Sequence, residues 1–348
     1  MAQAIRMALH YGEKHLKAMN IFGQDVGPPM GGVFTATQGL ETAWNSPLDE
    51  RGIVGMATGI AMAGDRCVAE IQFCDYIFNT IDLLKMIGNT HWVSHGNYSL
   101  PLVLMTPVGA GIRGSIYHSH SFDAWAVRMP GWKIVMPSNP LDAYGLMISA
   151  IKDPNPVLFL KPKALLRVRG DELIPGEPED EKKLKAMIDA PVGDRSKWRP
   201  QWPKLQDFAV PIGQAKITRE GHAATVVSYG RTLPICNRVA DNLRSEGVLI
   251  EVIDLRSIYP YDWQTVKSSI RKTGRVLFVN EDTEVTNFSE HLAFRTTQEL
   301  FYELQAPPKV LAGKHVPGIG LHPNLEEATV PHATDIEREV RALLQEVP

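Results

Sequence analysis

Continuous apolar runs alternate with amphipathic stretches along most of this chain, and the two patterns predict strands and helices in turn. In the first half, short apolar runs predict strands at 20–27, 67–73, 100–106, 133–137 and 157–161. Periodic stretches between them predict helices at 52–64, 76–95 and 139–152. Asn139 is expected to cap the last of these helices, with Pro140 in its first turn.

The second half repeats this alternation. It predicts strands at 223–228, 249–254 and 275–280, and helices at 233–246, 262–272, 283–305 and 335–344. The unbroken apolar run at 276–279 is typical of a parallel strand buried on both faces. The whole pattern predicts an α/β fold, with two doubly wound domains built on mainly parallel sheets.

The pattern weakens between the two halves. Residues 167–206 carry five prolines and a charged run at 176–183, without strong apolar periodicity. We therefore expect a long exposed linker, with a first domain at 1–166, the linker at 167–208 and a second domain at 209–348. The charged run is either a solvated surface or a docking surface for a partner.

The composition of the 348 residues is that of a globular protein, with 44% hydrophobic and 22% charged residues. The net charge of −3 provides no basic excess, so we expect no nucleic-acid partner. No apolar run is long enough to span a bilayer. The three cysteines form no pair at metal-binding or redox spacing, which favours a reducing compartment.

A glycine-rich motif at 109–114, Gly-Ala-Gly-Ile-Arg-Gly, follows a predicted strand and matches the spacing of a dinucleotide-binding loop. Such a loop would start a helix and have an acidic residue about 20 positions later. The following residues are a poor helix start, and the expected acid is missing. We therefore expect a tight turn beside an active site rather than a nucleotide site.

Three segments carry a family resemblance: 45–55 (NSPLDERGIVG), 69–78 (AEIQFCDYIF) and 117–121 (YHSHS). In this order they resemble the beta subunit of a thiamine diphosphate-dependent 2-oxo acid dehydrogenase, most closely the branched-chain 2-oxoisovalerate type. The resemblance continues at 252–260, and it is weak in the charged stretch and at 318–322. It implies a transketolase-like pyrimidine-binding domain followed by a transketolase C-terminal domain.

Glu50 is the main catalytic candidate that this resemblance provides. By local chemistry alone, Asp49 and Glu50 could simply stabilise the start of the following helix. The resemblance implies that Glu50 hydrogen-bonds N1′ of the thiamine aminopyrimidine and so helps to activate the cofactor. It also implies that Tyr76 lies against this ring, with Gln72 nearby, and Leu48 could supply the apolar surroundings that raise the pKa of a carboxyl group.

His118 is the second catalytic candidate. The pair His118 and His120 could suggest a metal, but nothing nearby supplies further ligands, and a core or exposed histidine is the local alternative. The resemblance implies that His118 borders the reacting carbon and acts in substrate binding or acyl transfer to lipoyl as a proton donor. His120 stands where relatives have glutamine, so its own role is open.

The turn at 150–156 has two interpretations. Its prolines, Asp153 and Asn155 are ordinary turn residues. The resemblance instead implies a potassium ion, held by oxygens of Ala150, Asp153 and Asn155 together with the carbonyl of Leu102.

A Gly-Asp-Gly motif, which in stand-alone thiamine enzymes holds Mg²⁺ and the diphosphate, is absent from this sequence. The resemblance therefore implies that an alpha subunit holds both, in an α₂β₂ assembly that serves a lipoyl acyltransferase core. The implied reaction is oxidative decarboxylation of a 2-oxo acid with reductive acylation of lipoyl, in a bacterial cytoplasm or a mitochondrial matrix. Alternatives are a pyruvate or acetoin dehydrogenase beta subunit, or a non-catalytic scaffold of the same fold.

Overall fold

The computed structural model describes residues 1–195 and 197–346, and the chain divides into two compact units. Unit 1 consists of Met1–Pro107, Met129–Lys161 and Leu165–Ile212. Unit 2 consists of Val108–Arg128, Pro162–Ala164 and Gly213–Pro348. The pattern of apolar runs in each half of the sequence thus corresponds to a unit with its own sheet.

The sheet of unit 1 has the order β5-β6-β4-β3-β1-β2. β1 pairs in parallel with β2 and β3, β3 with β4, and β5 with β6. Every residue of β4 is buried, as expected for a parallel strand covered on both faces. The strand bounds are β1 Ala18–Gly23, β2 Ala43–Asn45, β3 Arg66–Glu70, β4 Leu102–Val108, β5 Lys133–Val135 and β6 Val157–Pro162.

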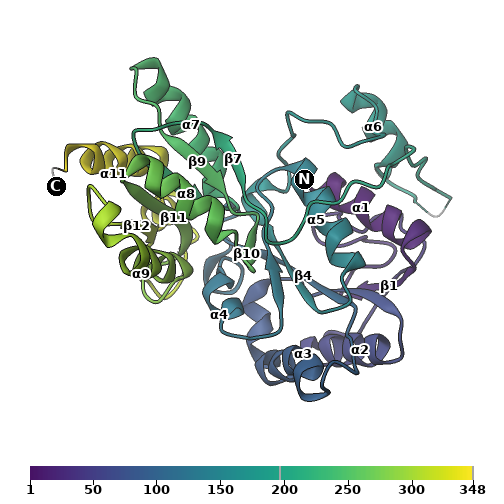
Figure 1. Cartoon of the computed structure of the whole chain (residues 1–348). Coiled ribbons are helices and arrows are strands. Elements are labelled where there is room, and N and C mark those ends of the chain that lie inside the picture. The colour runs from purple at the N-terminus through teal and green to yellow at the C-terminus, as the bar shows by residue number, and fades with distance from the viewer. Residues whose placement is uncertain (196, 347–348) are drawn as a thin grey trace. The chain divides into compact units, whose positions relative to one another are not determined.

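Helices cover both faces of this sheet (Figure 1): α1 (Ala2–His15) and α5 (Pro140–Lys152) lie on one face, and α2 (Glu50–Met62) and α3 (Ile81–Val93) on the other. The prediction that Asn139 caps α5 is confirmed, because its side chain accepts a 2.8 Å hydrogen bond from the Asp142 amide. The helix expected at 76–95 instead begins as a 3-10 helix, η1 (Cys74–Thr80). No element was expected where α1 forms.

The expectation of an exposed linker at 167–206 is wrong, since this stretch folds onto unit 1. It forms α6 (Glu181–Ile188), which buries Leu184 and Ile188 in the core that α1 and α5 share. The ring of Trp202 stacks on His10 of α1, with centroids 4.0 Å apart. The sparse apolar residues are sufficient because the rest of unit 1 provides the core they join.

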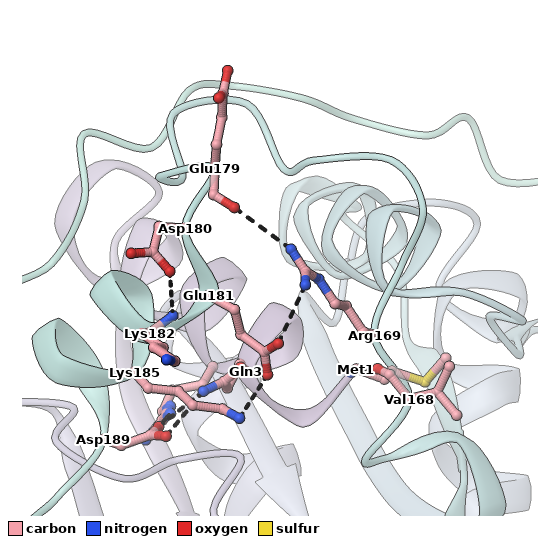
Figure 2. Close-up of polar contacts among 11 residues, drawn as sticks. Met1, Gln3, Val168, Arg169, Glu179, Asp180, Glu181, Lys182, Lys185 and Asp189 are labelled. Carbon is pink, nitrogen blue, oxygen red and sulfur yellow. Dashed lines mark hydrogen bonds and ion pairs between the residues drawn. The ribbon is translucent and has the colours of Figure 1, made fainter.

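Polar contacts fasten the same stretch (Figure 2). Asp189 accepts a 3.0 Å hydrogen bond from Gln3 and pairs with the buried guanidinium of Arg6. Glu181 pairs with Arg169 at 3.3 Å and with Lys185 at 2.6 Å. Within the charged run at 176–183, Glu181 is thus held by two ion pairs in unit 1.

Unit 2 has a five-stranded sheet in the order β12-β11-β8-β9-β7, parallel except for the antiparallel pair of β7 and β9. Its strands are β7 Lys216–Arg219, β8 Thr225–Ser228, β9 Glu251–Asp254, β11 Val276–Thr283 and β12 Lys309–Gly313, with the short β10 at Ser257–Tyr259. Its main helices are α7 Thr232–Ser245, α8 Trp263–Thr273, α9 Phe288–Leu300 and α11 Ala333–Gln345. The shorter ones are α4 Asp123–Val127 and α10 Pro323–Thr329.

The boundary between β11 and α9 differs from the prediction of one helix at 283–305. β11 continues to Thr283, and Asn287 starts α9 by accepting hydrogen bonds from the amides of Ser289 (2.8 Å) and Glu290 (3.2 Å). Pairing of β11 with neighbouring strands outweighs the helical pattern at its end, whereas the capping asparagine is a local signal that could have marked the start.

Candidate active site

Glu50 is the first residue of α2 and follows β2 after a short turn. Its side chain is half-buried, and Oε2 lies 3.5 Å from Nδ2 of Asn79, at the outer limit of a hydrogen bond. The adjacent Arg51 pairs with Asp82 at 2.6 Å, so its charge is directed away from Glu50. Leu48 leaves 71% of its surface exposed beside this carboxylate.

The alternative that Asp49 and Glu50 simply stabilise the start of α2 is compatible with the geometry of Glu50. Asp49 occupies the N-cap with extended backbone, but its side chain makes no capping hydrogen bond. Glu50 lies in the first turn, where a negative charge interacts favourably with the helix dipole. That interaction needs only the charge, so it leaves the carboxylate available for another partner.

Tyr76 lies in η1, half-buried, with the edge of Phe73 against it at a centroid distance of 6.0 Å. Burial raises the pKa of Tyr76, and the negative charges of Asp75 and Glu50 raise it further. The phenol therefore stays protonated at neutral pH. Asn79, which lies 3.5 Å from Glu50, belongs to the same 3-10 helix as Tyr76, so the Glu50 carboxylate lies beside η1.

The ends of three neighbouring parallel strands bring these residues to one edge of unit 1. β1, β2 and β3 end at Gly23, Asn45 and Glu70. Gln72 follows β3, and its amide donates a 3.0 Å hydrogen bond to Asp25, which follows β1. Ligands of open parallel sheets bind beyond the carboxyl ends of the strands, which is where Glu50 and Gln72 lie.

A buried ion pair at this sheet end was not predicted. Glu70, the last residue of β3, pairs with Lys161 of β6, and the two residues are 2% and 0% exposed. Each belongs to a strand that is otherwise mostly apolar, and a charge in such a run is the signal that could have indicated it. Both partners of the pair belong to strands of unit 1.

The turn after α5 does not favour the predicted potassium ion. The carboxylate of Asp153 pairs with Lys133 at 2.5 Å, and the guanidinium of Arg66 contacts the carbonyls of Ile151 and Asp153 at 2.5 and 3.2 Å. Two cationic side chains thus already occupy oxygens of the turn. The buried Oδ1 of Asn155 has no hydrogen-bond partner among the described residues. The potassium site that includes Leu102 and Ala150 stays a prediction. The two cationic side chains at the turn argue against it.

His118 belongs to unit 2 and ends the strained loop that begins at Gly109. Gly109, Gly111, Arg113 and Ser115 all have left-handed backbone, with φ of +79°, +108°, +54° and +63°. A Cβ on Gly109 would lie 2.0 Å from Oε1 of Glu281, so glycine is required there. The loop leads into the three-residue turn η2 (Ser115–Tyr117), not an α-helix, which agrees with the rejection of a nucleotide site.

The imidazole of His118 is half-buried, and Nδ1 lies 3.1 Å from the carbonyl oxygen of Gly114. Donation from Nδ1 to this carbonyl would direct Nε2 away from the loop. His118 lies in unit 2, whereas Glu50, Gln72 and Tyr76 lie in unit 1. Their union in one catalytic centre therefore stays a prediction.

A cluster of buried acids in unit 2 was also missed. Asp123 accepts a 2.7 Å hydrogen bond from the phenol of Tyr229, and Asp282 accepts a 3.3 Å bond from the Ala124 amide. Burial, and then the charge of Asp282, raise the pKa of Asp123 well above its usual range. Burial also raises the pKa of Asp282 and Glu281. The partners come from distant segments, which leaves no local pattern.

A cavity of about 590 Å³ in unit 1 contains none of the predicted site residues; it is lined by α1, α6 and the stretch around Val168. Among the described residues, no group of three or more His, Cys, Asp and Glu could hold a metal ion. The three cysteines are buried and unpaired with one another. Over the described parts of the chain, no helix combines the length and apolarity needed to cross a membrane.

Two domain families match the chain. Residues 1–169 match the transketolase pyrimidine-binding domain, and residues 213–336 match the transketolase C-terminal domain. A solved structure of a split-gene transketolase, described as an inactive beta4 tetramer, has a TM-score of 0.71 to this chain at 18% identity. The match covers 99% of this chain and 98% of the transketolase chain, which establishes the common fold.

Known sequences identify the family more closely. The chain is 33% identical to the 2-oxoisovalerate dehydrogenase subunit beta of Bacillus subtilis (strain 168), over 98% of this chain and 97% of that protein. It is 34% identical to the mitochondrial 2-oxoisovalerate dehydrogenase subunit beta 2 of Arabidopsis thaliana, over 90% and 81%. The pyruvate dehydrogenase E1 component subunit beta of Rhizobium meliloti (strain 1021) is 32% identical, over 98% and 69%. The chain belongs to the beta subunits of the thiamine diphosphate-dependent 2-oxo acid dehydrogenases.

Proposed function

We propose that this chain is the beta subunit of a branched-chain 2-oxo acid dehydrogenase. With an alpha subunit, it would decarboxylate a 2-oxo acid oxidatively and transfer the acyl group to lipoyl on an acyltransferase core. The observation that carries this proposal is the half-buried carboxylate of Glu50, which lies beyond the ends of parallel strands and beside η1, the 3-10 helix that contains Tyr76. The match to 2-oxoisovalerate dehydrogenase beta subunits supports the substrate class.

The residues of unit 1 fit the pyrimidine end of thiamine diphosphate. When bound, this cofactor supplies the carbon centre that accepts the electrons released by decarboxylation. Glu50 would hydrogen-bond a ring nitrogen from its half-buried position at the start of α2. The protonated phenol ring of Tyr76 would stack against the pyrimidine. The exposed Leu48 would provide an apolar contact, and Gln72 a polar one.

An alpha subunit would hold the diphosphate and Mg²⁺, because the sequence lacks the Gly-Asp-Gly motif for them. The surface of unit 1 supports such a partner. Met56 and Met62 of α2 and Met86 and Trp92 of α3 are exposed. Large exposed apolar side chains on adjacent helices are typical of a protein–protein interface. An α₂β₂ assembly would cover this surface.

His118 would serve the second half of the reaction. Its Nδ1 is directed to the Gly114 carbonyl, so Nε2 could donate a proton to lipoyl sulfur during acyl transfer. The imidazole is suited to this because histidine exchanges protons near neutral pH. The positive charge of His120 lowers the pKa of Asp282, one of the cluster of buried acids in unit 2. Its role would be to support that cluster rather than to react.

The decisive experiment is to assemble the chain with its alpha partner and compare Glu50→Gln with Asp49→Asn. Glu50→Gln should lower the rate of 2-oxo acid decarboxylation by about 10²–10⁴-fold, since a positioned acid–base group contributes about this much. Asp49→Asn is the matched control and should leave the rate near that of the parent. Equal rates in the parent and Glu50→Gln would mean that Glu50 only stabilises the start of α2.

The same assembly distinguishes the branched-chain enzyme from its main alternative. Pyruvate-type relatives are nearly as similar to this chain as the branched-chain ones, at 32% identity against 33%. We expect kcat/KM for 2-oxoisovalerate to exceed that for pyruvate by roughly 10- to 200-fold per pocket-filling methylene. A clear preference for pyruvate would overturn the branched-chain assignment. Absence of any 2-oxo acid decarboxylation would favour a non-catalytic scaffold.

A further inference from the structure

We propose that Glu326 is a positioning residue for His118. Glu326 lies on α10 of unit 2, far along the chain from the histidine. Its carboxylate holds the backbone of the 109–115 loop, and the loop in turn sets the place of the imidazole. This inference rests on the proposed function, in which His118 acts in acyl transfer.

The contact itself is a pair of convergent hydrogen bonds. The backbone N–H groups of Gly111 and Arg113 donate to one oxygen of Glu326, Oε2, at 3.1 and 2.9 Å. Two amides of one turn, two residues apart, that converge in this way form a concave anion site, here filled by a side chain of the same protein. Hydrogen bonds to an ionised carboxylate are among the stronger ones in proteins.

The loop needs such support because its backbone is strained. Arg113 and Ser115 are not glycines, yet both have left-handed φ. Such conformations persist only where the surroundings enforce them. Glu281 contributes as well, by accepting a 3.1 Å hydrogen bond from the Ala110 amide. Acidic groups of unit 2 thus fasten the loop at Ala110, Gly111 and Arg113.

The path from Glu326 to His118 is short. Gly114 follows Arg113 directly, and its carbonyl oxygen lies 3.1 Å from Nδ1 of His118. At the start of the loop, the Gly109 amide donates a 2.8 Å hydrogen bond to the His120 carbonyl, which joins the two ends of the segment that contains the imidazole. Release of the Arg113 amide would therefore free the carbonyl that orients the ring.

A second contact couples the same region to the loop. A Cβ on Gly318 would lie 2.5 Å from Cγ2 and 3.0 Å from Cα of Ile116, so the two backbones touch. Gly318 belongs to the tract in which the family resemblance is weak. α10 itself buries none of its residues, so its attachment depends on contacts such as that of Glu326.

Hydrogen exchange of the full chain tests the contact without cofactor or partner. In Glu326→Ala, peptides that cover 109–120 should exchange at least about tenfold faster, since two charge-assisted hydrogen bonds are lost. Other unit 2 peptides, such as those from β8 and α7, should exchange as in the parent. The matched control is Glu327→Ala, because Glu327 is the exposed neighbour on the same helix. Unchanged exchange in Glu326→Ala, or equal changes in both variants, would overturn the proposal.

Kinetics of the assembled complex test the effect on His118. Glu326→Ala should lower kcat for lipoyl acylation by about 10- to 100-fold, as expected for a misplaced catalytic group, with little change in KM for the 2-oxo acid. Glu326→Gln keeps an acceptor oxygen without the charge and should recover part of the loss. Faster loop exchange with parental acylation would refute the positioning role. An inactive parent complex would refute the proposed function but leave the exchange result standing.

A third variant changes the other contact of the loop, which is the contact of Ile116 with Gly318. Gly318→Ala keeps Glu326 but introduces a Cβ against the backbone of Ile116, so the tract or the loop must shift. We expect faster exchange at 109–120, as in Glu326→Ala. Parental exchange in Gly318→Ala would restrict the fastening to the carboxylate, and it would contradict the part of the proposal that assigns this tract to the loop.

Discussion

One buried acid of unit 1 and one cluster of buried acids in unit 2 are neutralised in different ways. In unit 1, Glu70 is 2% exposed and pairs with the equally buried ammonium of Lys161. In unit 2, Asp123 is 1% exposed and faces other acids, Asp282 and Glu281, with the phenol of Tyr229 as its hydrogen-bond donor. Burial, and then the charge of Asp282, raise the pKa of Asp123, which favours its protonated form where unit 1 has a cation.

This difference predicts which kind of change destabilises each unit. A buried ion pair is costly to break, because the remaining charge has no solvent and no partner. A buried acid that holds its proton tolerates replacement by a neutral group but not ionisation. Unit 1 should therefore be sensitive to mutations that remove a charge, and unit 2 to pH.

The largest expected effect is in unit 1. Lys161→Met should destabilise unit 1 by about 3–5 kcal/mol, because it leaves the carboxylate of Glu70 buried alone. The control is Lys152→Met, which breaks the exposed 2.6 Å pair with Asp207 and should cost only about 0–1 kcal/mol. Hydrogen exchange of unit 1 peptides in urea measures both, since the two units need not unfold together. Similar costs for both variants would remove the distinction between the pairs.

The next effect is the pH dependence of unit 2. The raised pKa of Asp123 stabilises the folded state most below the ordinary aspartate pKa, and this contribution is lost as pH rises through the folded value. The asparagine in Asp123→Asn has no proton to lose. As pH rises, the free energy of unfolding of the parent should therefore fall, relative to that of Asp123→Asn, by up to about 1.4 kcal/mol per pH unit. Unfolding of unit 2 followed by hydrogen exchange from pH 5 to 8 would measure this. Glu327→Gln, at an exposed position, should parallel the parent.

Parallel pH profiles of the parent and Asp123→Asn would mean that Asp123 is ionised throughout this range. The acids of unit 2 would then be neutralised as those of unit 1 are, by a cation. Arg231 would be the first candidate, because its Nε lies 3.8 Å from Glu281 in the same cluster.

The smallest effect compares two phenols. Tyr229→Phe removes the 2.7 Å hydrogen bond to buried Asp123, and Tyr144→Phe removes a 2.8 Å bond to the carbonyl of exposed Gln206. We expect a cost of about 1–3 kcal/mol for Tyr229→Phe, because its acceptor cannot reach water. Tyr144→Phe should cost about 0.5–1.5 kcal/mol, since its acceptor can be hydrated. Denaturant unfolding of each unit measures the difference, and a larger cost for Tyr144→Phe would contradict this account.

The sequence identified the candidate residues better than their surroundings. Glu50 was predicted just before a helix, and Gln72 near the end of a strand, because both positions follow from local patterns. The ions and hydrogen bonds around them were not predictable in this way. Arg66 and Lys133, which occupy the turn proposed for potassium, come from strands 87 and 20 residues away from Asp153. No spacing rule connects such residues.

By itself, the sequence determined the alternation of strands and helices, the cap at Asn139 and the family, because periodicity, capping and motifs are properties of neighbouring residues. Only the tertiary structure decided that 167–206 packs onto unit 1 and that α1 lies in the core beside α5. It also decided that Glu326 reaches amides 215 and 213 residues away and that Tyr229 meets Asp123. These contacts depend on how the elements pack, and packing brings together residues whose sequence separation carries no signal.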